Sequence, residues 1–285
     1  NAALAWPSGR KGGEPVTAAG GWRSYVAIGD SLTEGLQDLD AHGEPVGWAD
    51  RLAQHLADRA GGPVSYANLA IRGRLLRPIL EEQVGPALAL APGLVSIWGG
   101  GNDMLRPDAD PDAMAAAVED AVVAFRAIGT DVLIGLGVDA RDSPVISLTR
   151  SRTAIYNMNL VGVANRHGAH VLDAWNMRFL RDWRMWHEDR LHLNALGHER
   201  VAQAALVALG LEPDALDWDA PLPPVAPMSR REWLDWNITW ARDWAGPWVG
   251  RRIRRTSSGA GRTARQPSYR EVLPAPRRDS GPTAS

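Results

Sequence analysis

The chain has 285 residues, of which 45% are hydrophobic, and a formal net charge of −2. This charge argues against a specific nucleic-acid binder, and the absence of cysteine excludes disulfides, thiolate catalysis and cysteine-ligated metal. No apolar run approaches the roughly 18 residues needed to cross a bilayer, so we expect no transmembrane segment.

The N-terminal segment, residues 1–22, is rich in Gly, Ala and Pro and predicts a flexible leader. It lacks the apolar region of a secretory signal peptide. We therefore expect a cytoplasmic protein or one of undetermined compartment, and the sequence leaves open the alternative that a secretion signal has been removed.

A short apolar strand, predicted at Tyr25–Ile28, runs through a glycine turn into Ser31, where a helix can begin. A serine at such a turn is exposed, and the neighbouring backbone N–H groups can stabilise a developing oxyanion. The alternative is an ordinary helix cap, because Glu34 lies at the position that completes a capping box. Ser31 is thus either a candidate nucleophile or a cap.

Two further apolar strands, predicted at Val64–Asn68 and Leu94–Trp98, are each followed by residues that suit a ligand site. Gly73 follows the first strand, and Asn102 follows a run of glycines after the second. A glycine brings its backbone N–H close to a ligand, and an asparagine amide is a neutral donor suited to an oxyanion. A simple turn is the alternative role of the glycines.

The rest of the domain alternates between short apolar runs and segments of helical periodicity. This alternation is typical of a three-layer α/β/α sandwich with a five-stranded parallel sheet, in which ligands bind beyond the carboxyl ends of the strands. The remaining strands are predicted at Val132–Gly135 and His170–Leu172, and the helices at Trp48–Ala60, Leu75–Leu90, Pro111–Ile128, Arg152–His167 and Ala195–Leu209.

Asp189 and His192 lie just before the last of these helices. A serine nucleophile needs an imidazole to accept its proton and a carboxylate to orient the imidazole, and this spacing can place both on one side of a turn. The pair also occurs by chance, and Asp189 as a helix cap is the alternative. A catalytic zinc ion would need several histidine ligands, and no H-E-x-x-H pattern occurs. We therefore expect no metal and no organic cofactor. The histidines considered are His167, His170, His187, His192 and His198.

In this order, the four segments resemble the SGNH hydrolase superfamily, also called GDSL esterases. Gly29-Asp30-Ser31-Leu32 is similar to the first motif of the family, Gly100-Gly101-Asn102-Asp103 to its G-x-N-D motif, and Asp189 with His192 to its D-x-x-H motif. Three motifs in this order are far more specific than any one of them.

The resemblance implies a catalytic arrangement and a strand order. Ser31 is the implied nucleophile, His192 the base and Asp189 its orienter. The implied oxyanion hole consists of the Ser31 N–H, the Gly73 N–H and the Asn102 amide, and the implied strand order is the flavodoxin-like 2-1-3-4-5. The residues expected to support this site from behind are Asp30, Asn68 and Asp103.

Beyond the predicted hydrolase domain, 23–211, the composition indicates three appendages: a Pro-rich linker at 212–228, a Trp-rich helix at 229–249 and an Arg-rich disordered tail at 250–285. Tryptophans at helical spacing predict a stripe that packs on the domain, with an interfacial helix as the alternative. The tail is expected to be solvated or to contact anionic surfaces. The stripe consists of Trp233, Trp236, Trp240 and Trp244.

Together these features predict a serine-dependent hydrolase of carboxylic esters that acts through an acyl-enzyme. The expected substrate is a small-molecule, lipid or sugar ester, with short-chain acyl or acetyl esters favoured. An acyltransferase with the same triad and a non-catalytic binding protein with the same fold stay open. Three arginines near Gly73 either favour an anionic substrate or are solvated; they are Arg72, Arg74 and Arg77.

Overall fold

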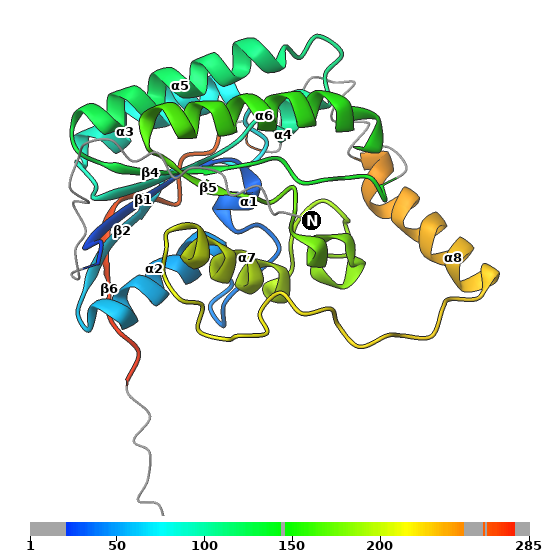
Figure 1. Cartoon of the computed structure of the whole chain (residues 1–285). Coiled ribbons are helices and arrows are strands. Elements are labelled where there is room, and N and C mark those ends of the chain that lie inside the picture. The colour runs from blue at the N-terminus through cyan, green and yellow to red at the C-terminus, as the bar shows by residue number, and fades with distance from the viewer. Residues whose placement is uncertain (1–20, 144–145, 248–258, 260, 277–285) are drawn as a thin grey trace, which may run out of the picture.

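The computed structural model describes residues 21–143, 146–247, 259 and 261–276. Over these residues the chain forms one six-stranded sheet between two layers of helices (Figure 1). Most of the predicted leader and the tail residues 250–258, 260 and 277–285 lie outside the described part.

Five parallel strands make up most of the sheet. Their spatial order is 2-1-3-4-5, so the predicted three-layer sandwich and the flavodoxin-like order are confirmed. Successive side chains point to opposite faces, as in any strand: Tyr25 packs into one apolar cluster and Val26 into the other. The strands are β1 (Ser24–Gly29), β2 (Val64–Asn68), β3 (Leu94–Trp98), β4 (Asp131–Gly135) and β5 (His170–Leu172).

The helices divide between the two faces of the sheet (Figure 1). One layer consists of α2 (Trp48–Ala60) and α7 (Ala195–Ala208), and the other of α3 (Leu76–Ala89), α5 (Pro111–Ala127) and α6 (Arg150–His167). None of the helices in the described ranges is long and apolar enough to span a membrane. The shorter elements are α1 (Ser31–Glu34), α4 (Gly101–Met104), η1 (Ile146–Thr149), η2 (Arg178–Arg181) and η3 (Trp183–Met185); α8 (Arg230–Trp240) and η4 (Ala241–Ala245) follow the Pro-rich segment.

The turn between β1 and α1 is fixed by close packing. A Cβ atom on Gly29 would lie 2.4 Å from Trp98 O, so only glycine fits at this position. The buried Gln83 side chain accepts a hydrogen bond from Gly29 N at 2.8 Å and donates one to Gly29 O at 3.0 Å. These contacts set the place at which the chain leaves the sheet and enters α1.

Asp30, and not Ser31, caps helix α1. The Asp30 carboxylate accepts a hydrogen bond from Leu32 N at 3.2 Å. Glu34, the residue expected to complete a capping box with Ser31, instead binds the backbone N–H and the guanidinium of Arg72. The capping alternative for Ser31 is therefore wrong, and its side chain is left for another role.

A sixth strand, β6 (Gln266–Val272), pairs antiparallel with β2 at the edge of the sheet. The sequence predicted a disordered tail at 250–285 and a wholly parallel sheet, so this strand corrects the first expectation for residues 266–272 and the second for the edge of the sheet. The pairing gives hydrogen-bond partners to the backbone N–H and C=O groups along the edge of β2. In addition, Tyr269 and Val272 pack against the two apolar clusters.

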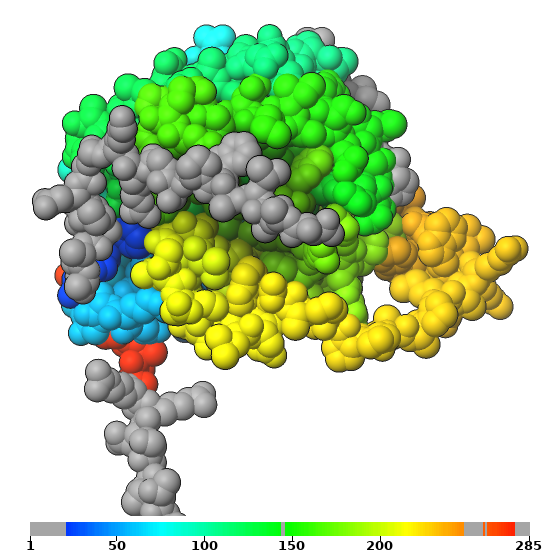
Figure 2. Space-filling model, viewed as in Figure 1, coloured from blue at the N-terminus to red at the C-terminus, as the bar shows by residue number. Residues whose placement is uncertain are grey.

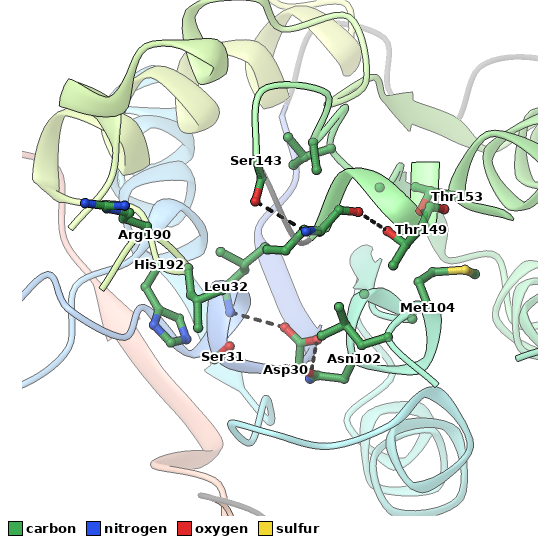
Figure 3. Close-up of a pocket in the computed structure, with 18 of the residues that line it drawn as sticks. Asp30, Ser31, Leu32, Asn102, Met104, Ser143, Thr149, Thr153, Arg190 and His192 are labelled. Atoms are coloured by element: carbon green, nitrogen blue, oxygen red, sulfur yellow. Dashed lines mark hydrogen bonds between the residues drawn. The ribbon is translucent and has the colours of Figure 1, made fainter. Parts of the chain in front are cut away.

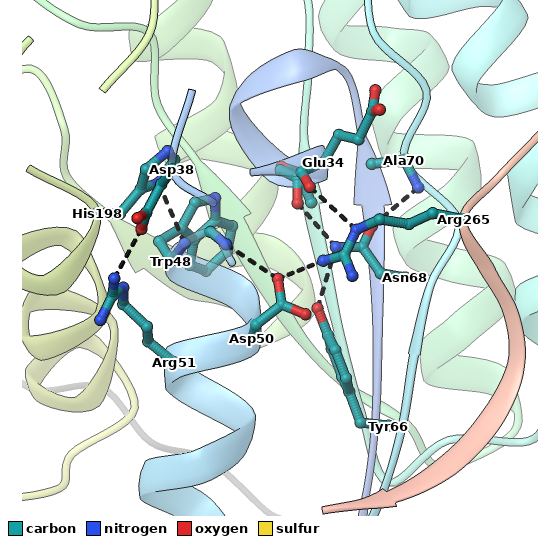
Figure 4. A network of polar contacts seen from close by, with 12 residues as sticks. Glu34, Asp38, Trp48, Asp50, Arg51, Tyr66, Asn68, Ala70, His198 and Arg265 are labelled. Atoms are coloured by element: carbon teal, nitrogen blue, oxygen red, sulfur yellow. Dashed lines mark hydrogen bonds and ion pairs between the residues drawn. The ribbon is translucent and has the colours of Figure 1, made fainter. Parts of the chain in front are cut away.

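Ion pairs with Asp50 of α2 fasten β6 to the domain (Figure 4). Asp50 is only 7% exposed; Arg265 binds its Oδ2 atom, and Arg270 Nη2 donates to Oδ1 at 3.2 Å. Arg265 Nε also donates to Glu34 O at 3.1 Å, which links β6 to the C-terminal end of α1. These two tail arginines therefore stabilise the fold. The predicted contact of the tail with anionic surfaces concerns arginines that lie mainly outside the described residues.

Replacing Arg265 should destabilise the fold much more than replacing Arg270. We expect Arg265→Ala to lower the free energy of unfolding by roughly 2–4 kcal/mol, because it removes the more buried partner of a buried carboxylate. Arg270→Ala is the matched control: its side chain is 49% exposed, so we expect a loss of about 1 kcal/mol or less. Urea denaturation measures both, and equal losses would show that Arg265 does not anchor β6.

Candidate active site

A cavity of about 990 Å³ opens beyond the carboxyl ends of β1, β3 and β4 (Figure 3). Its lining includes all five residues that were predicted to act directly in catalysis, although they come from four separate segments. These residues are Ser31, Gly73, Asn102, Asp189 and His192. The fold therefore brings the candidate nucleophile, base, orienter and oxyanion donors to one place.

Ser31 is the first residue of α1, and its partly exposed side chain faces the cavity. Figure 3 shows the His192 ring beside it. Within the part of the chain that the structure describes, Ser31 Oγ makes no hydrogen bond. Hydrogen bonds between a nucleophile and its base often tighten only when substrate is bound, so this geometry is compatible with proton transfer.

Asp189 and His192 form a hydrogen-bonded pair. His192 Nδ1 lies 2.7 Å from Asp189 Oδ2, and Asp189 Oδ1 accepts from the backbone N–H groups of Leu191 at 2.9 Å and His192 at 3.0 Å. Burial raises the pKa of Asp189, but these hydrogen bonds and the charge of His192 outweigh it, so the net shift is downward. An ionised Asp189 fixes the proton of His192 on Nδ1 and leaves Nε2 as the basic nitrogen.

Gln37 is a further neighbour of this pair that sequence reasoning missed. Its Nε2 atom donates to Asp189 Oδ2 at 3.3 Å, and the residue has a left-handed backbone with φ of 72°. Gln37 lies far from Asp189 in the chain, and no motif marks it. Only the three-dimensional fold shows that these two residues meet.

The Asn102 amide is held in place by two acceptors. Nδ2 lies 3.0 Å from Arg74 O and 3.2 Å from Asp30 Oδ2 (Figure 3). Asn102 follows Gly100, whose φ of 102° favours glycine and turns the chain into α4. Asp30 thus contacts a candidate oxyanion donor directly, as its expected supporting position suggested.

Asp30 is buried beside the candidate nucleophile. Burial raises the pKa of its carboxyl to about 6, although the hydrogen bond from Leu32 N and the charge of His192 partly oppose the shift. The ionised form is therefore unfavourable in the folded state over the pH range in which an exposed aspartate is fully charged.

This shift predicts a pH-dependent difference in stability between the parent and Asp30→Asn. A carboxyl whose pKa is raised on folding contributes stability at low pH, and that contribution is lost as the pH rises through the folded value. Relative to Asp30→Asn, the parent should therefore lose about 2 kcal/mol of unfolding free energy between about pH 4 and about pH 7. Urea denaturation at both pH values measures the difference.

Asp189→Asn is the control, because its cost in stability should change with pH in the opposite direction. The pKa of Asp189 is lowered, so the stability cost of Asp189→Asn should be largest above about pH 5 and should shrink as the pH falls below about 4. The same pH trend for both substitutions would contradict the assigned environments of Asp30 and Asp189.

Asn68 and Asp103 support the site without lining the cavity. Asn68 is fully buried, and its Nδ2 donates to Thr33 O at 2.8 Å, which holds α1 against the end of β2. Asp103 Oδ2 accepts from Leu76 N at 2.9 Å at the start of α3. Both residues therefore hold the elements that carry the cavity residues.

The arginines near Gly73 do not line the cavity. Arg72 binds Glu34, Arg74 lies 2.9 Å from Glu82 and Arg77 lies 2.7 Å from Glu81. These ion pairs give the arginines local partners, so the cavity offers no support for an anionic substrate held by them.

The histidines considered for zinc include His187 and His192, whose Nδ1 atoms lie 3.7 and 2.7 Å from Asp189 Oδ2. Among the described residues, no three His, Asp or Glu side chains gather in a way that could hold a metal ion. His198 is fully buried, which lowers its pKa to about 3, and its Nδ1 accepts from Trp48 N at 3.1 Å. It is a neutral structural residue that joins α7 to α2.

Known proteins resemble this chain in sequence family and in fold. A protein-family model, the GDSL-like Lipase/Acylhydrolase family, matches residues 27–200. A search of curated proteins found no match. The similar solved structures include LAE5, an alpha/beta hydrolase enzyme from the metagenome of Lake Arreo, Spain, which is 23% identical, covers 68% of this chain and 97% of its own, and has a TM-score of 0.56.

Two other solved structures show the same fold. Axe2, an acetylxylan esterase from Geobacillus stearothermophilus, is 20% identical over 68% of this chain and 97% of its own, with a TM-score of 0.56. TesA is 22% identical over 65% of this chain and 97% of its own, with a TM-score of 0.53. At these identities the likeness establishes the fold.

Proposed function

The chain belongs to the GDSL-like lipase/acylhydrolase family and is a carboxylic ester hydrolase, and from this premise we propose that it acts through an acyl-enzyme on Ser31. In the proposed first step, Ser31 Oγ attacks the ester carbonyl carbon while His192 Nε2 accepts the hydroxyl proton. His192 then gives this proton to the departing alcohol. In the second step, His192 removes a proton from water, whose oxygen attacks the acyl carbon. The bond from the acyl carbon to Ser31 Oγ then breaks, and His192 returns the proton to Ser31 Oγ as the acid leaves.

One observation carries this proposal: a hydrogen-bonded Asp189–His192 pair lines the same cavity as an exposed serine at the start of a helix. The carboxylate orients the imidazole and stabilises it when it becomes charged, which is the requirement for activating a serine at neutral pH. The burial of Asp189, which is only 4% exposed, strengthens this interaction by excluding water.

The proposed oxyanion hole consists of the Ser31 N–H, the Gly73 N–H and the Asn102 amide. Both hydrogens of the Asn102 amide have acceptors, so a developing oxyanion must replace one of them. The longer contact, 3.2 Å to Asp30 Oδ2, is the one that we expect to exchange. Because this exchange favours the charged transition state over the neutral ester, the amide should contribute chiefly to kcat.

Short-chain acyl or acetyl esters are the proposed substrates. The cavity has a volume of about 990 Å³ and is lined by both apolar and polar side chains. The acetylxylan esterase among the similar structures supports an acetyl group on a sugar as one such ester. The apolar lining includes Leu32, Met104, Leu105, Leu180 and Trp186.

A substrate panel tests this assignment. Acetyl, butyryl and long-chain p-nitrophenyl esters, together with acetylated xylose, should be ranked by kcat/KM, and we expect the acetyl or butyryl compounds to rank first. A long-chain ester at the top would contradict the proposed acyl preference. Adding a primary alcohol and analysing the products separates hydrolysis from acyl transfer, because a transferase would form the new ester at the expense of the free acid.

A further inference from the structure

Helix α8 lies outside the residues matched by the family model. It contacts the loop that carries Asp189 and His192. It follows the segment matched by the family model and stands out from the body of the molecule (Figure 2). No residue of α8 is fully buried. The partly buried residues lie on one side of the helix and are Trp236, Asn237 and Trp240. The predicted stripe therefore meets the domain through part of its length, while Trp233 is 56% exposed.

The group that α8 contacts is the guanidinium of Arg190, which lies between the two members of the Asp–His pair in the sequence. Arg190 Cζ lies 3.3 Å from the ring centre of Trp236 and 4.8 Å from that of Trp240. Its Nη1 donates to Asn237 Oδ1 at 2.8 Å, and its Nη2 donates to Trp236 O at 3.2 Å. Stacking on aromatic faces and forked hydrogen bonds are interactions for which arginine is better suited than lysine.

Helix α8 also binds the backbone of the catalytic aspartate. Trp240 Nε1 donates to Asp189 O at 3.0 Å. The carboxylate of the same residue receives His192 Nδ1 and two backbone N–H groups. Asp189 is therefore fixed at its carbonyl by α8, and at its side chain by its own loop and by Gln37, whose Nε2 donates to Oδ2.

Arg190 occupies an unfavourable conformation and environment. Its φ of 58° is left-handed, which is uncommon for a residue other than glycine. The residue is only 9% exposed, its Nε atom has no hydrogen-bond partner among the described residues, and burial lowers the pKa of its guanidinium. Such backbone conformations cost free energy and persist only where the surrounding contacts hold them in place. They cluster at functional sites.

From these contacts we propose that Arg190 is a positioning residue and that α8, acting through Arg190 and Asp189 O, fixes the direction in which Asp189 presents Oδ2 to His192. The catalytic consequence rests on the proposed function. A misplacement of roughly 1 Å in a catalytic group can lower the rate by on the order of 10²-fold. The C-terminal extension thus supports the active site through Trp236, Asn237 and Trp240, which do not line the cavity. Arg190 itself does line it.

Point substitutions in the full chain test this role, since truncation would also remove β6. Trp240→Phe keeps an aromatic ring near Arg190 and removes only the donor to Asp189 O; we expect kcat to fall roughly tenfold with KM unchanged. Arg190→Ala removes the anchor, and we expect kcat to fall by roughly 10²-fold. Trp233→Phe is the matched control, because this exposed indole makes no ring contact among the described residues, and its kcat should stay within twofold of the parent.

Hydrogen exchange supplies a readout that does not depend on turnover. The Leu191 and His192 amides, which donate to Asp189 Oδ1, should exchange faster in Trp240→Phe and Arg190→Ala, and at the parent rate in Trp233→Phe. Unchanged exchange, or a kcat of Trp240→Phe within twofold of the parent, overturns the inference even if Arg190→Ala fails to fold. Failure of the proposed function would show differently, as full activity of Ser31→Ala.

Discussion

Replacing Ser31 with alanine should abolish nearly all ester hydrolysis, with kcat lowered by about 10⁴-fold or more. Without the hydroxyl no acyl-enzyme can form, and His192 has no proton to accept. The fold should be unaffected, because the side chain makes no hydrogen bond in the described part of the chain and caps no helix. Steady-state kinetics on p-nitrophenyl acetate, together with the melting temperature, measure both expectations.

Ser143→Ala is the control for this experiment, because Ser143 lines the same cavity. Its loss should lower kcat by less than tenfold, since among the described residues the hydroxyl accepts only a long hydrogen bond, 3.4 Å from Ile146 N. If Ser31→Ala retains a rate within tenfold of the parent, Ser31 is not the nucleophile. A large loss in Ser143→Ala instead would move the nucleophile to the other side of the cavity.

Replacing Asn102 with alanine should lower kcat by roughly 10²–10³-fold, about 2.7–4 kcal/mol of transition-state stabilisation, with little change in KM. Arg74 O and Asp30 Oδ2 hold the amide in place, so it needs only to exchange its contact with Asp30 for the proposed oxyanion. The alanine variant also leaves Asp30 without one of its two donors. Kinetics at substrate concentrations on both sides of KM separate the two constants.

Asp103→Asn is the matched control at the neighbouring position. Asparagine can still accept from Leu76 N through its side-chain oxygen, so α3 should stay in place and kcat should change by less than tenfold. An Asn102→Ala variant with raised KM and unchanged kcat would assign this amide to substrate binding and not to the oxyanion hole.

The five parallel strands of the sheet were predictable because each can be recognised from its own apolar residues. The segment that forms β3 is a continuous apolar run, as a strand buried on both faces requires, and its predicted bounds, Leu94–Trp98, match the structure. The segment that forms β6 has no such pattern. Its stability comes from pairing with β2 and from Arg265 on Asp50, partners that lie far away in the chain.

The same distinction between local and distant contacts applies to the site. Asp189 and His192 were predictable as a pair, because a hydrogen bond between residues three apart depends only on the local turn. The contact of Gln37 with Asp189 depends on how two distant loops meet. For α8, the spacing of the tryptophans predicted a docked helix, but it did not show that two of the indoles would enclose the cation of Arg190.

Covalent labelling tests the central claim, that Ser31 is the nucleophile of an ester hydrolase, most directly. The full chain is treated with a fluorophosphonate, residual esterase activity is followed over time, and the modified peptide is identified by mass spectrometry. We predict one adduct per chain, on Ser31, formed in proportion to the loss of activity and absent from Ser31→Ala. Complete inactivation with the adduct on another residue, or full labelling of Ser31 without loss of activity, would contradict the claim.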